Sequence, residues 1–293
     1  MTEGQPVVPL ETEGPRPRGS LLGFLALTFG VTWTFFISAA VWSGMPSSSG
    51  TLGPGPRVLV LLGTIAPSLI ALALTARFEG SAGTGALLGR VFQWQVGARW
   101  YVFAVGYMAA IKLATAVVHR LVTGARPRFG VDAWYLMLAA IPISMWVQAG
   151  EEIGWRGYAL PRLAARFGLG GASVGLGVIW AVWHLPLFYV LGADTFGQAF
   201  TTYLLQVVAL SVALAWLYWH TRGSLLLVML MHAAINNTKD IVPTVLRVPA
   251  NPLWPSASLM SWLGVAVLWV PAVYFLVRMR HAEVARLLKR DRP

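Results

Sequence analysis

Glu151, Glu152 and Arg156 lie within six residues at the end of an apolar run that begins near Trp134. A charged side chain near the centre of a bilayer costs roughly 2.5–3.5 kcal/mol on insertion scales. In apolar surroundings these groups therefore need partners, water or a chemical task. In a helix Glu152 and Arg156 share a face with the acid first, which is the favourable order for an ion pair.

Glu151 is turned about 100° from Glu152 around a helix of 3.6 residues per turn. It shares its stripe with Trp155 and Tyr158, and no arginine lies on that face. A carboxylate without a cation in a dry site is a candidate general base, with Trp155 as a supporting neighbour. The alternative is a buried neutral glutamic acid that is hydrogen-bonded to a backbone carbonyl.

Two further pairs of polar side chains occur at helical spacing. His184 follows Trp180 by four residues and precedes Pro186, which lacks an amide hydrogen. His232 and Asn236 are also four apart, with two alanines between them that allow close approach of a neighbouring helix. For each pair the alternative to a functional role is hydrogen bonding between helices.

Together these groups are the ones that hydrolysis of an acyl bond requires. Glu151 would take a proton from water, and His184 would hold or polarise that water. His232 and Asn236 would donate hydrogen bonds to the developing oxyanion. A placed general base contributes about 10²–10⁴ in rate, and one oxyanion donor about 10²–10³.

The composition predicts the setting for this chemistry. Hydrophobic residues make up 57% of the 293 residues and charged residues 11%, against about 25% charged in soluble proteins. We therefore expect an all-α, polytopic transmembrane helical bundle of about eight spans, with membrane lipids as partners. The sequence has no cysteine, which excludes thiol catalysis and thiolate metal sites. No basic run interleaves with aromatic residues, so no nucleic-acid partner is expected.

Apolar runs between turn signals predict the spans. Pro67 is expected to kink the second span, and Pro161 to follow the fourth, with Arg162 and Arg166 in a loop. The seventh span is too short to cross a hydrocarbon core of about 30 Å without tilting or stopping part-way. The expected spans are 21–42, 57–76, 101–118, 131–160, 172–191, 200–219, 225–237 and 259–277.

The chain is expected to divide into three parts. Residues 1–19 are expected to form a disordered N-terminal tail, and residues 20–278 the transmembrane bundle with a protease-like core at 130–240. Residues 279–293 form a basic tail that we place on the cytoplasmic leaflet. An even number of spans then places both termini in the cytoplasm, as the net charge of +11 in short loops and tail also favours.

The motifs resemble those of the CPBP family of intramembrane proteases, which includes the CAAX prenyl endopeptidases and bacterial Abi-type proteins. The family motif E-E-x-x-x-R is present in full at residues 151–156. The motif F-x-x-x-H is matched at 180–184, with Trp180 in place of the usual Phe, and H-x-x-x-N at 232–236. The resemblance covers residues 130–240.

The resemblance implies an intramembrane endopeptidase in which Glu151 activates water beside His184, His232 and Asn236. It implies a bacterial plasma membrane protein whose substrate is a peptide or membrane protein, although use of a prenylated substrate does not transfer automatically. The family has been described both as metal-dependent and as glutamate-dependent. We favour a mechanism without a cofactor, while zinc held by Glu151, His184 and His232 stays an alternative.

Two functions of another kind stay open. One is a proton-coupled transporter in which Glu151, Glu152 and the histidines form a relay. The other is a membrane protein that keeps the scaffold without catalysis. Transport requires a gradient, whereas cleavage proceeds in detergent without one.

Overall fold

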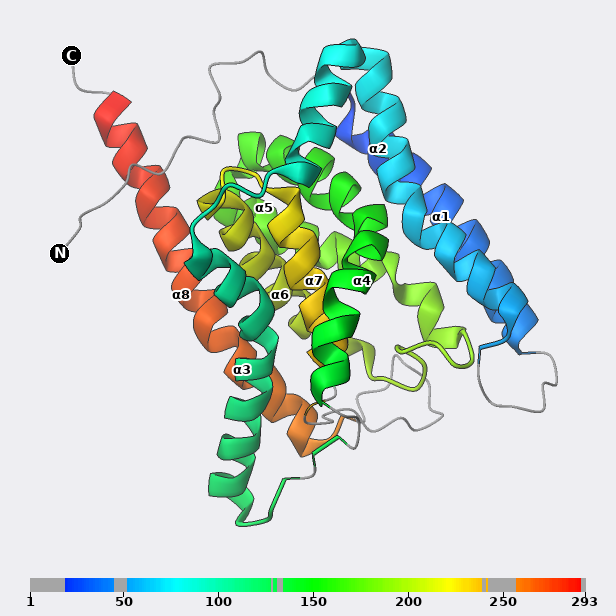
Figure 1. Ribbon diagram of the computed structural model, residues 1–293, viewed down its shortest axis with the longest axis vertical. Coiled ribbons are helices and arrows are strands. Elements are labelled where there is room, and N and C mark those ends of the chain that lie inside the picture. The colour runs from blue at the N-terminus through cyan, green and yellow to red at the C-terminus, as the bar shows by residue number, and fades with distance from the viewer. Residues whose placement is uncertain are drawn as a thin grey trace.

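Helices form the computed structural model, which describes residues 19–44, 52–127, 129–130, 134–238, 241 and 257–290 (Figure 1). Eight α-helices lie in these ranges, in agreement with the expected all-α fold class. Their bounds are α1 Leu21–Ser43, α2 Pro54–Gly89, α3 Ala98–Thr123, α4 Trp134–Glu152, α5 Leu160–Trp183, α6 Phe200–His220, α7 Leu225–Thr238 and α8 Leu259–Arg290. A π-helical segment, η2 (Ile153–Ala159), joins α4 to α5, and short 3₁₀ turns occur at η1 (Arg90–Phe92) and η3 (Leu185–Tyr189).

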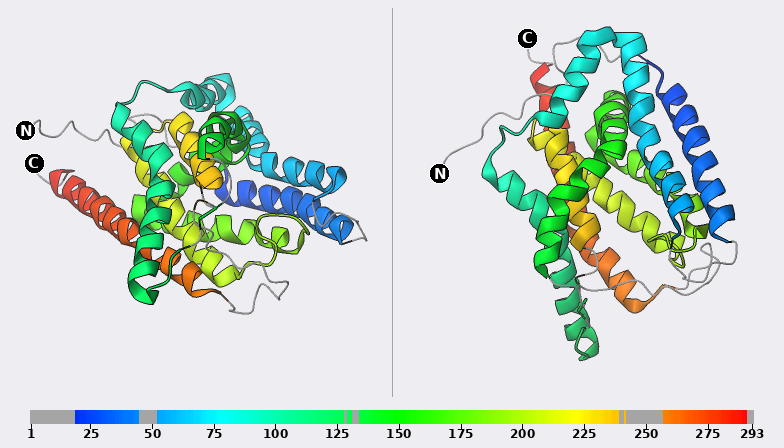
Figure 2. Two further views of the ribbon diagram at one scale, coloured as in Figure 1. Left: turned by 60° about the horizontal axis from the view of Figure 1, so that its bottom comes forward. Right: turned by 45° about the vertical axis from the view of Figure 1, so that its right-hand side comes forward.

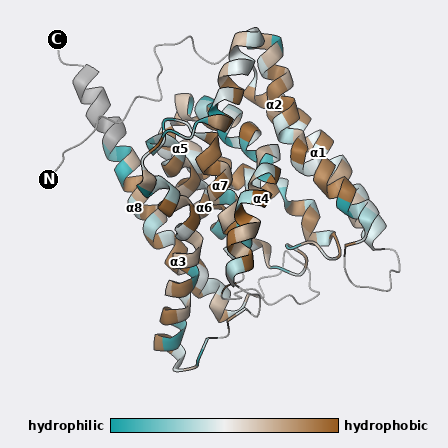
Figure 3. Ribbon diagram, in the orientation of Figure 1, coloured by the Kyte–Doolittle hydropathy of each residue, from teal (hydrophilic) through white to brown (hydrophobic). Residues whose placement is uncertain are grey.

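The outer surface of the bundle is apolar, as a bilayer requires. Six helical segments within the described residues are long and apolar enough to cross a membrane, and one of them, Tyr135–Tyr189, contains both α4 and α5. Large hydrophobic side chains such as Leu22, Val102 and Val270 are exposed on the outer helices. Figure 3 shows hydrophobic residues predominating along α1, α2 and α3. The expected polytopic transmembrane bundle is therefore confirmed.

The short helix α7 lies inside the bundle. Ten of its 14 residues are buried, and it packs mainly against α3 and α4. Figure 2 shows α1 and α2 side by side on one flank and α3 with α8 on the other. Because other helices cover most of α7, it does not have to cross the hydrocarbon core by itself.

The sequence predicted a kink of α2 at Pro67. Backbone angles stay helical through Pro67 and leave the helical region at Gly80, whose φ is 69°. The break in the helical backbone therefore lies at Gly80, while a bend of the helix axis at Pro67 stays a prediction. A proline leaves the carbonyl four residues earlier without its amide donor. Here that carbonyl, on Gly63, accepts a hydrogen bond of 3.0 Å from the hydroxyl of Thr32 on α1. The neighbouring helix therefore supplies what the proline removes.

The fourth span also continues further than predicted. Helical backbone passes through Pro161 and breaks at Gly168, whose φ is 67°. A proline in the first turn of a helix is tolerated, because its missing N–H is not needed there. Arg162 was expected in a loop but lies in this helix, where it pairs with Glu79 at 2.6 Å.

Several predicted segments fall outside the described residues. The tail at 1–19 is described only at Gly19, and the segment 239–257 between the last two expected spans only at residues 241 and 257. Helix α8 continues to Arg290, beyond the predicted end of the last span at Val277. The membrane orientation of the termini stays a prediction.

Candidate active site

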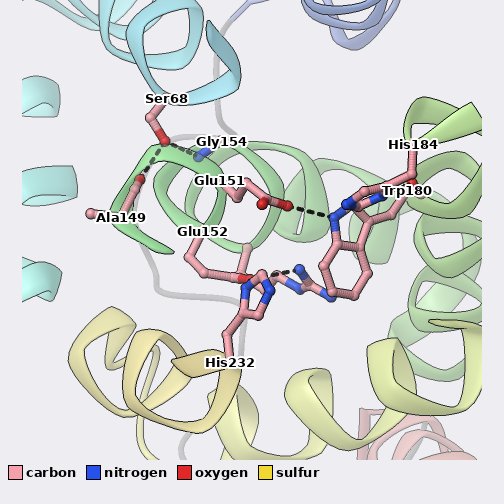
Figure 4. A network of polar contacts seen from close by, with 9 residues as sticks. Ser68, Ala149, Glu151, Glu152, Gly154, Trp180, His184 and His232 are labelled. Carbon is pink, nitrogen blue, oxygen red and sulfur yellow. Dashed lines mark hydrogen bonds and ion pairs between the residues drawn. The ribbon is translucent and has the colours of Figure 1, made fainter. Parts of the chain in front are cut away.

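A widened helical turn carries the two adjacent carboxylates. Glu151 and Glu152 end α4, and the π-helical segment η2 begins at the next residue. Ser68 of α2 inserts its hydroxyl beside this turn, donating to the carbonyl of Ala149 at 2.6 Å and accepting from the amide of Gly154 at 3.2 Å (Figure 4). One hydroxyl from another helix thus joins the two ends of the turn that bears both acids.

Close packing against α2 explains the glycine in this turn. A Cβ atom on Gly154 would lie 2.7 Å from the backbone carbon and oxygen of Pro67. Real Cβ atoms do not approach backbone so closely, so any larger residue would push α2 away from η2. The contact that brings Ser68 within reach of the turn therefore depends on glycine at position 154.

Glu151 is 5% exposed and interacts with a neutral donor. Its Oε2 atom accepts a hydrogen bond of 2.7 Å from the indole Nε1 of Trp180 on α5. No ion pair to Glu151 occurs among the described residues. The expectation that Glu151 has no arginine on its own face therefore agrees with the structure.

Glu152 is fully buried and accepts hydrogen bonds from two side chains. Its Oε1 atom lies 2.9 Å from Nη1 of Arg156, which is the predicted ion pair, and 2.7 Å from Nδ1 of His232 on α7. The two neighbouring carboxylates thus point to different partners, as their rotation around the helix predicted. The link from Glu152 to His232 was not predicted.

Hydrogen-bond partners define the tautomers of the two histidines. Nδ1 of His184 lies 2.8 Å from the carbonyl oxygen of Trp180, and Nδ1 of His232 faces the carboxylate of Glu152. Since both partners accept, each Nδ1 carries a proton. Each Nε2 makes no hydrogen bond within the described part of the chain. In the neutral ring this atom holds a lone pair that can accept from water.

Trp180 lies at the centre of the cluster and is 4% exposed. Its ring centroid is 5.6 Å from that of His184 and 5.2 Å from that of His232, with steep interplanar angles. The guanidinium carbon of Arg156 lies 4.2 Å from the same ring, in cation–π geometry. Glu151, Glu152, Arg156, His184 and His232 therefore each contact Trp180 or one of its partners.

Two predicted site residues lie apart from this network. Trp155 is fully buried and packs against Phe24 of α1 and Trp183 of α5, so it supports the helix packing rather than Glu151 directly. Asn236 is exposed, and its amide makes no hydrogen bond to the described residues. It lies one turn from His232 on α7, as its spacing predicted, and its role as a donor stays a prediction.

Sequence reasoning missed three residues around the site. Ser68 and Tyr203 belong to no motif and come from helices without predicted site residues. The ring of Tyr203 lies 5.7 Å from that of His184. Asn237 donates to the hydroxyl of Ser144 and to the carbonyl of Ala233, both at 2.8 Å, and so ties α7 to α4. Only its position beside Asn236 could have drawn attention to it.

The residues named for zinc do not form a metal-binding group. Among the described residues, no three His, Asp or Glu side chains are gathered so that they could hold a metal ion. Oε2 of Glu151 already has a protein partner, whereas each histidine is bonded at Nδ1 and makes no hydrogen bond from Nε2 to the described residues.

Comparisons with known proteins match the part of the chain that carries this site. Residues 132–238 match the family model described as type II CAAX prenyl endopeptidase Rce1-like. The chain is 23% identical over 226 residues to CAAX prenyl protease 2 of Methanococcus maripaludis, and the match covers 73% of this chain and 82% of that protein. The matched segment contains the site residues Glu151, Glu152, His184, His232 and Asn236. The resemblance of this chain to the CPBP family of CAAX-type intramembrane proteases is thereby confirmed.

Proposed function

We propose that the protein is an intramembrane endopeptidase that hydrolyses a peptide bond at or near the membrane, with Glu151 as general base. One observation carries the proposal. Glu151 is a buried carboxylate oriented by a neutral indole N–H, beside an imidazole whose Nε2 makes no hydrogen bond to the described residues. Such a carboxylate can accept a proton from water, because none of the described cations forms an ion pair with it.

The first step is the attack of water on the scissile carbonyl. Glu151 accepts one proton of a water molecule, and Nε2 of His184 accepts a hydrogen bond from the other. These two contacts direct the oxygen lone pair at the carbonyl carbon. A C–O bond forms, and the carbonyl oxygen takes up the negative charge.

The second step is the collapse of the tetrahedral intermediate. His232 and Asn236 donate to the oxyanion from Nε2 and the amide. To donate from Nε2 the ring of His232 must carry both protons, and Glu152 at 2.7 Å supplies the counter-charge. Glu151 then gives its proton to the leaving nitrogen as the C–N bond breaks. The products are a carboxylic acid and an amine, and Glu151 is regenerated.

The substrate is proposed to be a peptide or membrane-protein segment that reaches this buried site from the membrane. The name of the methanococcal relative makes a farnesylated peptide that ends in a C-a-a-X sequence the first substrate to test. The same peptide without the lipid shows whether the prenyl group is required.

The test uses purified protein in detergent, where no gradient exists. Cleavage by the wild type and at least 100-fold slower cleavage by Glu151→Gln, with an unchanged melting temperature, supports the proposal. The substitution keeps the size of the side chain and removes the base. Glu79→Gln, which alters the ion pair with Arg162, is the matched control and should keep its activity.

Other outcomes separate the alternatives. Full activity of Glu151→Gln overturns the assignment of the base. Failure to cleave together with gradient-dependent uptake in vesicles favours the transporter. A chelator series on the wild type tests the metal requirement, and a loss of activity that added zinc restores would overturn the metal-free mechanism.

A further inference from the structure

Trp180 carries a group that a smaller aromatic side chain would not supply. A phenyl ring can also fill space and contact a guanidinium, but it has no N–H group. In this chain the indole N–H is engaged, since it donates to Oε2 of Glu151 at 2.7 Å.

We infer that Trp180 is a positioning residue that holds the carboxylate of Glu151 for catalysis through its indole N–H. The inference rests on the proposed role of Glu151 as base. The contact is buried, because Trp180 is 4% exposed and Glu151 5% exposed. A buried hydrogen bond to a carboxylate is short and strong, and it restricts the rotation of a side chain that has three flexible torsions.

The neutrality of the indole is what suits it to this task. An arginine or lysine in the same place would fix Glu151 equally well but would supply a counter-charge and weaken it as a base. The nearest cation, Arg156, is held by Glu152 at 2.9 Å. Its guanidinium lies 4.2 Å from the centroid of the Trp180 ring. The ring of Trp180 therefore lies against the guanidinium of Arg156, while its N–H orients Glu151 through a hydrogen bond to Oε2.

Because the indole N–H binds Oε2 of Glu151, the other oxygen, Oε1, stays available to a water molecule. Misplacement of a catalytic group by about 1 Å can cost about 100-fold in rate. Loss of the indole N–H is therefore expected to lower kcat by about 10–100-fold. KM should stay within about threefold, because the N–H contacts the base and not the substrate.

Trp269→Phe is the matched control for Trp180→Phe. The indole Nε1 of Trp269 on α8 also donates one hydrogen bond, to the backbone carbonyl of Leu205 at 3.1 Å. Both substitutions therefore remove the same atoms and one N–H hydrogen bond. We expect both to lower the melting temperature, but a loss of kcat only for Trp180→Phe.

A second variant separates the N–H from the size of the ring. Site-specific replacement of Trp180 by 3-benzothienylalanine keeps two fused rings and puts sulfur in place of the N–H. The expected kcat is as low as that of Trp180→Phe, with wild-type stability. Wild-type kcat in the benzothienyl variant overturns the inference, even if Trp180→Phe does not fold.

Combination with Glu151→Gln shows whether Trp180 acts through Glu151. If it does, Trp180→Phe lowers the residual rate of Glu151→Gln by less than about threefold, because the base is already lost. An undiminished further loss overturns the inference. Inactive Glu151→Gln with fully active Trp180→Phe refutes only the role of Trp180, whereas fully active Glu151→Gln refutes the proposed function itself.

Discussion

Nδ1 of His232 lies 2.7 Å from Oε1 of Glu152, so a carboxylate on α4 holds an imidazole that is 80 residues away in sequence. The same oxygen accepts from Arg156 at 2.9 Å. Glu152 therefore does more than neutralise one arginine, because it also determines which nitrogen of His232 faces the rest of the site.

Glu152→Gln should destabilise the protein strongly. Arg156 would keep its charge in a fully buried position without its ion-pair partner, and breaking a buried pair costs about 3–5 kcal/mol. Unfolding in a denaturing detergent would measure the loss. The double variant Glu152→Gln/Arg156→Met should regain part of the stability, since the unpaired charge is removed. Wild-type stability of Glu152→Gln would argue against this account of the ion pair.

Ser68→Ala should lower both stability and cleavage. It leaves the buried amide of Gly154 and the carbonyl of Ala149 without the hydroxyl that joins them, at a cost of about 1–3 kcal/mol. The turn that carries both glutamates would also lose its link to α2. Thermal unfolding and the rate of peptide cleavage would measure the two effects.

Thr75→Ala is the control for Ser68→Ala. Thr75 is buried on the same helix, and its hydroxyl bonds only to the carbonyl of Ala71 within α2. Its loss should cost about 0.5–1.5 kcal/mol and leave cleavage unchanged. Equal cleavage by Ser68→Ala and Thr75→Ala would show that the bridge by Ser68 does not position the acids.

Gly154→Ala and Gly175→Ala should change stability in opposite directions. A Cβ at position 154 would lie 2.7 Å from the backbone of Pro67, so overpacking should cost about 1–3 kcal/mol. A Cβ at position 175 meets no atom within 4 Å, and alanine in a helix interior should gain about 0.5–1 kcal/mol. Thermal unfolding of the two variants measures these opposite changes in stability. A stable, active Gly154→Ala would contradict the close packing of α2 on η2.

The adjacent asparagines of α7 should separate catalysis from stability. Asn236→Ala should slow cleavage by about 10²–10³-fold if the amide donates to the oxyanion, while the melting temperature stays unchanged because the side chain is exposed. Asn237→Ala should instead lower the melting temperature, since it loses its bonds to Ser144 and Ala233. Loss of activity only in Asn237→Ala would reverse the assignment.

Local periodicity explains what could be predicted from the sequence. The ion pair of Glu152 with Arg156, and the divergence of Glu151 from Glu152, follow from the helical repeat within one segment. The all-α fold follows from long apolar runs, and the seventh helix was recognised as short. Proline signals were less reliable, because Thr32 on a neighbouring helix compensates for Pro67, and the breaks lie at Gly80 and Gly168.

The contacts that make a site of these residues depend on tertiary structure. Glu151 meets Trp180 across 29 residues, and Glu152 meets His232 across 80. Ser68 reaches the π-helical turn from α2, and nothing in its sequence neighbourhood indicates this. The helical repeat determines which side chains share a face of one helix. Only the packing of α2, α5 and α7 around the turn decides which faces meet, because that depends on the shapes of all the helices at once.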